Sequence, residues 1–133
     1  MIHPHSVFFR RFFTVVCVVV WLTAATATHI PADSMPDISV GDVLLHFTGY
    51  LGLTGVFLFT LRVHGVRLSH RILLTFPLLL LYGILDELTQ PLVNRYASIF
   101  DWLANAVGIS GALILDTAIT LLQRMGKKYL LQR

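Results

Sequence analysis

The residues of this chain that could do chemistry fall into three short polar clusters, which long apolar runs separate. The clusters are Asp42-x3-His46 with Tyr50 one turn further on, then Glu87-x2-Gln90, and then Arg95-x5-Asp101-x3-Asn105. Together they supply carboxylates, an imidazole, amides and a guanidinium. Such groups serve in acid–base catalysis, in metal ligation and in anion binding. What they do therefore depends on whether the apolar runs bring them to one place.

The first cluster pairs a carboxylate with an imidazole. Asp42 and His46 are four residues apart, so they share one face of a helix, and Tyr50 continues that face. A carboxylate can orient an imidazole and raise its basicity. We therefore predict that His46 is a catalytic base or ligand, that Asp42 orients it, and that Tyr50 contacts a ligand. The alternative for Asp42 is a helix N-cap, because it precedes an apolar run.

Glu87 is the most informative member of the second cluster. It lies near the C-terminal end of an expected helix, where the helix dipole disfavours a carboxylate. It also lies about 22 Å along a helix that would cross ~30 Å of hydrocarbon. A carboxylate at that depth needs a cation, a metal or a proton. We predict that Glu87 is a catalytic acid or ligand and that Gln90, three residues on, contacts the same ligand.

The third cluster adds the one basic residue near these acids. The guanidinium of Arg95 suits bidentate binding of a phosphate or carboxylate, so we predict an anion clamp. The alternatives are a solvated loop arginine and a structural partner for Glu87. Asp101 is a further candidate catalytic carboxylate, with helix N-capping as its alternative. Asn105 lies one turn deeper on the same face and is a predicted ligand contact.

The clusters carry no recognised catalytic signature. No serine or cysteine of a known nucleophile motif lies among them, and the chain has no histidine-rich metal signature. The sequence therefore assigns no metal and no cofactor. Cys17 is the only cysteine, so the chain forms no disulfide within itself, and we expect this thiol to be a small packing residue.

The elements that must position these clusters are membrane helices. Of the 133 residues, 56% are hydrophobic and 13% are charged, which is about half the charged fraction of a soluble domain. Apolar runs close to the ~20 residues that cross a bilayer occur four times. We predict an all-α membrane protein, a single domain over residues 1–133, with transmembrane helices at about 12–28, 43–61, 72–89 and 100–122.

The basic residues predict how the helices are oriented. Arg95 alone lies on one side of the expected membrane, and the other side holds Arg10, Arg11, Arg62, Arg67, Arg71, Arg124, Lys127, Lys128 and Arg133. By the positive-inside rule, both termini are cytoplasmic and the three clusters meet at the outer face. Most acids share that face, namely Asp33, Asp37, Asp42, Asp86, Glu87 and Asp101. The charge thus reflects topology and contact with membrane lipids, and no motif indicates a nucleic-acid partner.

Two features have alternatives that the sequence leaves open. Asp116 lies toward the inner leaflet, and it is either protonated, paired across the bundle, or close to Arg62 or Arg71; we leave it out of the site.

The first apolar run ends in Ala25-Thr26-Ala27, which fits a signal-peptide cleavage site after Ala27. Retention as a helix is favoured, because the run is long for a signal peptide and three helices make a thin bundle.

Residues 42 to 112 resemble the VanZ-like family of small bacterial membrane proteins. The resemblance rests on Asp42-x3-His46-Phe47-x2-Tyr50, Tyr82-Gly83-x3-Glu87-x2-Gln90 and Arg95-x5-Asp101-x3-Asn105-x2-Gly108. The chain departs from the family pattern at Val43, Asn94 and Gly111. Val43 stands where the family often has lysine, so no second basic side chain is expected at the site besides Arg95. The resemblance implies a protein of the bacterial cytoplasmic membrane, associated in some members with teicoplanin resistance, and it supplies no settled mechanism.

Four functions fit the clusters. The first is a pocket that binds an envelope lipid or peptidoglycan precursor and so contributes to glycopeptide resistance. The second is an enzyme that modifies an envelope lipid by acid–base or metal-assisted chemistry. Ion or proton transport ranks below both, because transport needs polar groups along the whole bundle. The fourth is purely structural, with the polar groups satisfying one another and fixing helix register.

Overall fold

The chain folds into long apolar helices. The computed structural model describes residues 7–31 and 41–132, and in this part it contains no strand. The helices are α1 (Val7–Thr28), α2 (Asp42–Val63), α3 (Leu68–Thr89), the short 3-10 helix η2 (Gln90–Val93) and α4 (Ile99–Leu131). Each of the four α-helices in the described residues is long and apolar enough to cross a membrane. The protein is therefore an all-α, multi-pass membrane protein, as the sequence predicts.

The helix boundaries differ from the expected spans at the ends. α1 begins at Val7 instead of residue 12, and α4 continues to Leu131 instead of ending near 122. The hydropathy pattern marks the apolar part of a helix, whereas arginine and lysine favour helix almost as well as leucine does. Basic residues can therefore extend a helix beyond its apolar part. Asp33 and Asp37, which we expected at the outer face, lie outside the described residues.

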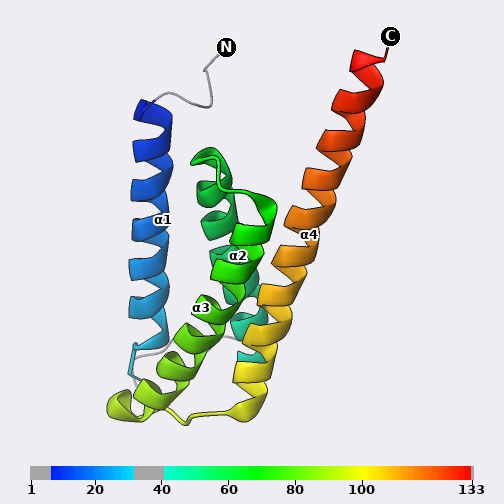
Figure 1. The fold of residues 1–133 in the computed structure, drawn as a ribbon. Helices are drawn as coiled ribbons and strands as arrows, with labels where there is room; N and C mark the ends of the chain where they lie inside the picture. Colours follow the sequence, from blue (N-terminus) through cyan, green and yellow to red (C-terminus); the bar gives the residue numbers. More distant parts are fainter. Residues whose placement is uncertain (1–6, 32–40, 133) are drawn as a thin grey trace.

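The two ends of the bundle have different compositions. Figure 1 shows that α1 begins and α4 ends at one end, which lies at the top of the view. α2 begins, α3 ends and α4 begins at the other end, which we call the polar end because it carries the three clusters. Which end faces the cytoplasm stays a prediction from the basic residues.

Close packing of α2 against α4 fixes the relative height of the clusters. Gly108 of α4 lies so close to α2 that a Cβ added there would be 2.5 Å from the carbonyl oxygen of Phe47 and 3.0 Å from the amide nitrogen of Leu51. Small residues allow such close approach of helix backbones. Asn105 lies one turn before Gly108 and is thereby held beside α2. The outward faces of the helices are apolar and contact membrane lipids.

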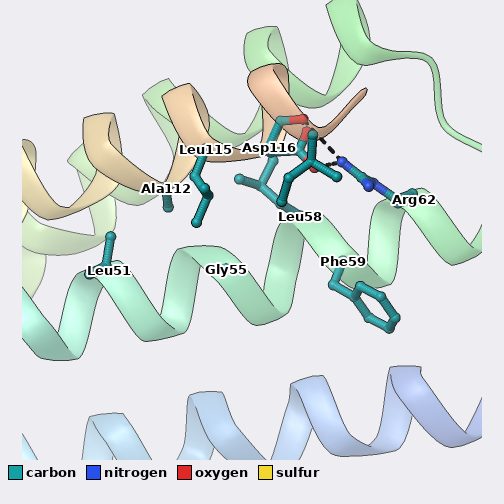
Figure 2. A pocket seen from close by; sticks show the side chains of 9 residues that line it. Leu51, Gly55, Leu58, Phe59, Arg62, Ala112, Leu115 and Asp116 are labelled. Carbon is teal, nitrogen blue, oxygen red and sulfur yellow. Dashed lines mark hydrogen bonds and ion pairs between the residues drawn. The ribbon is translucent and has the colours of Figure 1, made fainter. Parts of the chain in front are cut away.

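An ion-pair cluster joins three helices at the opposite end of the bundle. Asp116 of α4 accepts a hydrogen bond from Arg71 Nε at 3.0 Å and also binds Arg62 Nη2, while both arginines donate to Thr120. Figure 2 shows Arg62 and Asp116 pointing toward one another beside an apolar cavity of about 200 Å³. Of the alternatives for Asp116, the pairing with Arg62 and Arg71 is therefore the one that the structure contains. This cluster stabilises the bundle away from the polar end.

Candidate functional site

The polar end gathers the predicted site residues from three helix ends and a loop. α2 contributes the first cluster, α3 and η2 contribute the second, and the loop before α4 and the first turns of α4 contribute the third. Six of the predicted residues are buried there, and they are His46, Tyr50, Glu87, Gln90, Asp101 and Asn105. In contrast, the side chain of Asp42 is 51% exposed. The site is thus a buried polar core with Asp42 at its edge.

His46 is held by α4. Its Nδ1 lies 3.1 Å from the side-chain oxygen of Asn105, which accepts a hydrogen bond from it. Nε2 therefore carries the lone pair of the neutral ring and lies 3.8 Å from a carboxylate oxygen of Asp42. That distance is too long for a hydrogen bond. Asn105, rather than Asp42, thus orients the imidazole, and the predicted Asp42–His46 hydrogen bond is not present.

Asp42 instead binds Arg95. The N-cap position of α2 belongs to Gly41, so the N-capping alternative for Asp42 is wrong. Both carboxylate oxygens of Asp42 accept from Nη2 of Arg95, at 3.1 and 3.2 Å, and Nη1 donates to the backbone oxygen of Thr28. Within the described residues Arg95 forms no ion pair with Glu87, so the alternative of a structural Glu87 partner is also wrong. The arginine links the loop before α4 to both α1 and α2.

Glu87 organises the start of α4. Its Oε2 accepts a hydrogen bond from the backbone N–H of Ser98 at 2.9 Å, and its Oε1 lies 3.6 Å from His46 Nδ1. Ser98 is the N-cap of α4, and its hydroxyl accepts from the N–H of Asp101. Asp101 is therefore not the N-cap, because it lies three residues inside the capping serine. The carboxyl group of Glu87 thus meets a backbone donor and lies close to an imidazole.

A second carboxylate network at the polar end was not predicted. Asp86 accepts from the hydroxyl of Thr28 at 2.7 Å and from the hydroxyl of Tyr50 at 3.4 Å. His29 contacts the hydroxyl of Thr89 at 2.9 Å. These bonds attach the end of α1 to α2 and α3. The adjacent Asp86-Glu87 pair is the sequence signal that could have indicated this second network. Neighbouring side chains on a helix point in different directions, so the two carboxylates cannot share one partner.

Several buried polar groups in the site have capacity for further partners. Within the described residues no hydrogen bond is made by Glu87 Oε1, by either polar side-chain atom of Gln90, or by Asn105 Nδ2. Asp101 is 4% exposed as a residue, and its carboxylate has no hydrogen-bond or ion-pair partner there, although its oxygens are not fully enclosed. Buried polar groups in folded proteins are nearly always bonded. These groups are therefore available to bond water or a polar ligand.

A cavity of about 330 Å³ opens beside the polar core between α1 and α2. Its polar lining includes Asp42, His46, Tyr50 and Arg95, and its apolar lining includes Ala24, Ala27, Ile30, Leu45, Leu53 and Tyr82. The cavity is therefore amphipathic. Cleavage after Ala27, the alternative for the first apolar run, would remove the wall that α1 provides.

The site also has an excess of acidic side chains. Four carboxylates lie at the polar end of the described residues, namely Asp42, Asp86, Glu87 and Asp101, while Arg95 is the one arginine or lysine there. An acidic, partly buried site of this kind attracts cations more readily than it attracts free anions, and an anion would bind only where Arg95 lies.

Comparisons with known proteins assign no family to the chain. No protein-family model, no curated protein and no solved structure matches it. Function is therefore argued from the chemistry of the site.

Proposed function

We propose that this chain is a VanZ-like protein of the bacterial cytoplasmic membrane that binds an anionic envelope lipid or lipid-linked precursor at the outer face. Through this binding it contributes to resistance to teicoplanin-type glycopeptides. The observation that supports the proposal is the amphipathic cavity, which has a guanidinium, an imidazole and a phenol at one side and apolar walls elsewhere. A lipid with a charged headgroup has the same division.

Arg95 is the group that would hold the headgroup. Its contacts within the described residues use Nη2 for Asp42 and one N–H of Nη1 for Thr28, so further guanidinium donors remain for a phosphate. In the Asp42–Arg95 ion pair the carboxylate side chain is 51% exposed and the arginine side chain is 10% exposed, so the pair is open to solvent on the Asp42 side. A phosphate that enters from that side would compete with Asp42 for the guanidinium.

The apolar walls would hold the start of the lipid chain. Leu45 and Leu53 of α2 and Tyr82 of α3 line the cavity opposite Ala24 of α1. α1 is the least buried of the four helices, with 6% of its apolar window buried. A lipid chain that leaves the cavity along α1 would therefore meet the bilayer within a short distance.

Binding can be measured with a pair of lipids that differ only in the headgroup. Purified protein in nanodiscs is titrated with a polyprenyl phosphate and with the matching polyprenol. We expect saturable binding of the phosphate, at least about tenfold weaker binding of the alcohol, and loss of phosphate binding in Arg95→Gln. Arg67→Gln, an exposed arginine at the opposite end, is the matched control. Equal binding of the two lipids, or phosphate binding retained in Arg95→Gln, would show that the proposal is wrong.

The resistance part of the proposal has its own test. The chain is expressed in a teicoplanin-susceptible bacterium, and the inhibitory concentrations of teicoplanin and vancomycin are measured for native protein and for Arg95→Gln at equal membrane abundance. We expect a rise for teicoplanin with the native chain and none with the variant. An unchanged teicoplanin value with the native chain would disprove the link to resistance while leaving lipid binding intact.

An enzyme is the second candidate, because His46 and Tyr50 line the same cavity as Arg95. Incubation of purified protein with polyprenyl phosphate and envelope phospholipids, followed by mass spectrometry, would reveal a changed lipid if the site is catalytic.

Transport has less support. Apolar side chains with almost no exposure lie in the core between the polar end and the Asp116 ion-pair cluster, and they are Leu58, Leu79 and Ile109. Vesicles loaded with a pH-sensitive dye would test it.

A further inference from the structure

Three side chains that commonly ligate metals meet at the polar end. Asp42 and His46 come from the first two turns of α2, and Asp101 comes from the first turn of α4. One ligand atom from each lies within 4.8 Å of the others. We propose that these three residues bind one divalent transition-metal ion. The inference concerns the protein alone and does not depend on the proposed lipid.

The hydrogen bonding of His46 prepares it as a ligand. Its Nδ1 donates to the Asn105 oxygen, so Nε2 presents its lone pair. Nε2 and the nearest oxygen of Asp42 are 3.8 Å apart. Two ligands at about 2.0–2.2 Å from a tetrahedral metal are roughly 3.3–3.6 Å apart. A small adjustment at the exposed Asp42 side chain would therefore suffice on that edge.

Asp101 provides an independent indication of a bound cation. The residue is 4% exposed, and its carboxylate has no hydrogen-bond or ion-pair partner within the described residues. A carboxylate with so little contact with water and no protein partner is costly, although its oxygens are not fully enclosed. Its carboxylate is directed toward Asp42 and His46, as the ligand-atom distances require. A cation between the three residues would supply the missing partner.

The charge balance also favours a cation. Of the four carboxylates at this end of the described residues, Arg95 forms an ion pair with Asp42 only. A divalent ion would offset most of the remaining negative charge. Glu87 Oε1, which accepts no hydrogen bond, lies 3.6 Å from His46 and adds to the negative potential around the ligands.

The ligand set indicates the class of metal. One imidazole nitrogen with two carboxylate oxygens suits Zn²⁺ or Mn²⁺ better than Mg²⁺ or Ca²⁺, which prefer oxygen ligands alone. Three protein ligands leave at least one coordination position open, as in catalytic zinc sites. Asp42 and His46 also line the cavity, so the open position would be next to it.

Metal binding can be tested directly on the full chain. The protein is purified in detergent, stripped with a chelator and titrated with Zn²⁺ by calorimetry, with the bound metal counted by mass spectrometry. We expect one Zn²⁺ per chain, and affinities at least about tenfold weaker in Asp101→Asn and His46→Gln. Asp86→Asn removes a carboxylate from the same end but outside the ligand set, and its affinity should change by less than about threefold. The absence of stoichiometric Zn²⁺, or equal losses in Asp86→Asn and Asp101→Asn, would overturn the proposal.

A second measurement avoids dependence on the folding of the variants. Co²⁺ replaces Zn²⁺ in the native protein, and its visible absorption distinguishes four- or five-coordinate nitrogen–oxygen ligation from the weak spectrum of hydrated Co²⁺. An intense visible band supports the site, and a hydrated spectrum contradicts it. The Arg95→Gln variant separates the metal proposal from the lipid proposal. This variant should no longer bind polyprenyl phosphate. It should still bind Zn²⁺, because the substitution removes a positive charge that competes with the metal for Asp42. Loss of Zn²⁺ in Arg95→Gln would contradict the metal site, whatever happens to the lipid.

Discussion

His46 of α2 and Asn105 of α4 are joined by a buried hydrogen bond of 3.1 Å between Nδ1 and the amide oxygen. This bond crosses the most extensively packed pair of helices in the bundle. It sets which nitrogen of the imidazole is free, and it does so with a residue that is far from His46 in the sequence. The chemistry of His46 is thus controlled by the packing of α4.

Asn105→Ala tests this control. The change removes the acceptor for His46 Nδ1 and should destabilise the protein by about 1–3 kcal/mol. It should also weaken Zn²⁺ binding about tenfold, because the imidazole loses its orienting bond. Thermal unfolding in detergent and Zn²⁺ calorimetry give the two values. Ser110→Ala, which removes a hydroxyl bonded only within α4, is the control. Unchanged Zn²⁺ affinity in Asn105→Ala would show that the bond does not set the ligand nitrogen.

Gly108→Ala should separate α2 from α4. The added Cβ would lie 2.5 Å from the Phe47 carbonyl oxygen, which belongs to the backbone and cannot rotate away. We expect a loss of about 1–3 kcal/mol in unfolding free energy, together with weaker Zn²⁺ binding. Gly52→Ala on α2 is the matched control, since an added Cβ there meets nothing within 4 Å. Equal stability of the two variants would contradict the close packing.

Asp116→Asn should destabilise the opposite end without affecting the site. The carboxylate partners both Arg62 and Arg71, and removing one member of a buried ion pair costs about 3–5 kcal/mol. Chemical denaturation in detergent measures this loss. Zn²⁺ and polyprenyl phosphate affinities should stay at native values in the folded fraction. A proton flux through vesicles that Asp116→Asn abolishes would instead indicate transport.

Glu87→Gln separates the charge of Glu87 from its structural bond. Glutamine keeps an oxygen that accepts from Ser98 N–H, so the protein should accumulate in the membrane at close to the native level. The negative charge beside His46 is lost, and we expect the teicoplanin phenotype to disappear. Glu87→Ala removes the bond as well and should reduce accumulation, which makes it the structural comparison. A native phenotype in Glu87→Gln would assign Glu87 a structural role only.

The sequence was sufficient to predict the helices and the meeting of the clusters. Hydrophobicity over some twenty residues is a local property, so the apolar parts of α2 and α3 agree closely with the expected 43–61 and 72–89. The alternation of helix directions then places the clusters at one end. The polar helix ends were less predictable, because basic residues can continue a helix that hydropathy does not mark.

The sequence could not specify which polar groups would pair. Asp42 was expected to orient His46, yet it binds Arg95, and Asp101 was a candidate N-cap, yet Ser98 caps α4. These outcomes depend on the rotation of each helix about its axis and on the turn that η2 and Asn94 make before α4.

The sequence by itself thus determined a four-helix membrane bundle with its chemistry gathered at one end, because local hydrophobicity and charge decide which segments cross a bilayer. Only the tertiary structure decided that Asp42, His46 and Asp101 converge and that Asn105 frees one nitrogen of the imidazole. The physical reason is that hydrogen bonds and metal ligation act over about 2–3 Å. Contacts at that scale follow from helix rotation and close packing at Gly108, which residue spacing does not encode.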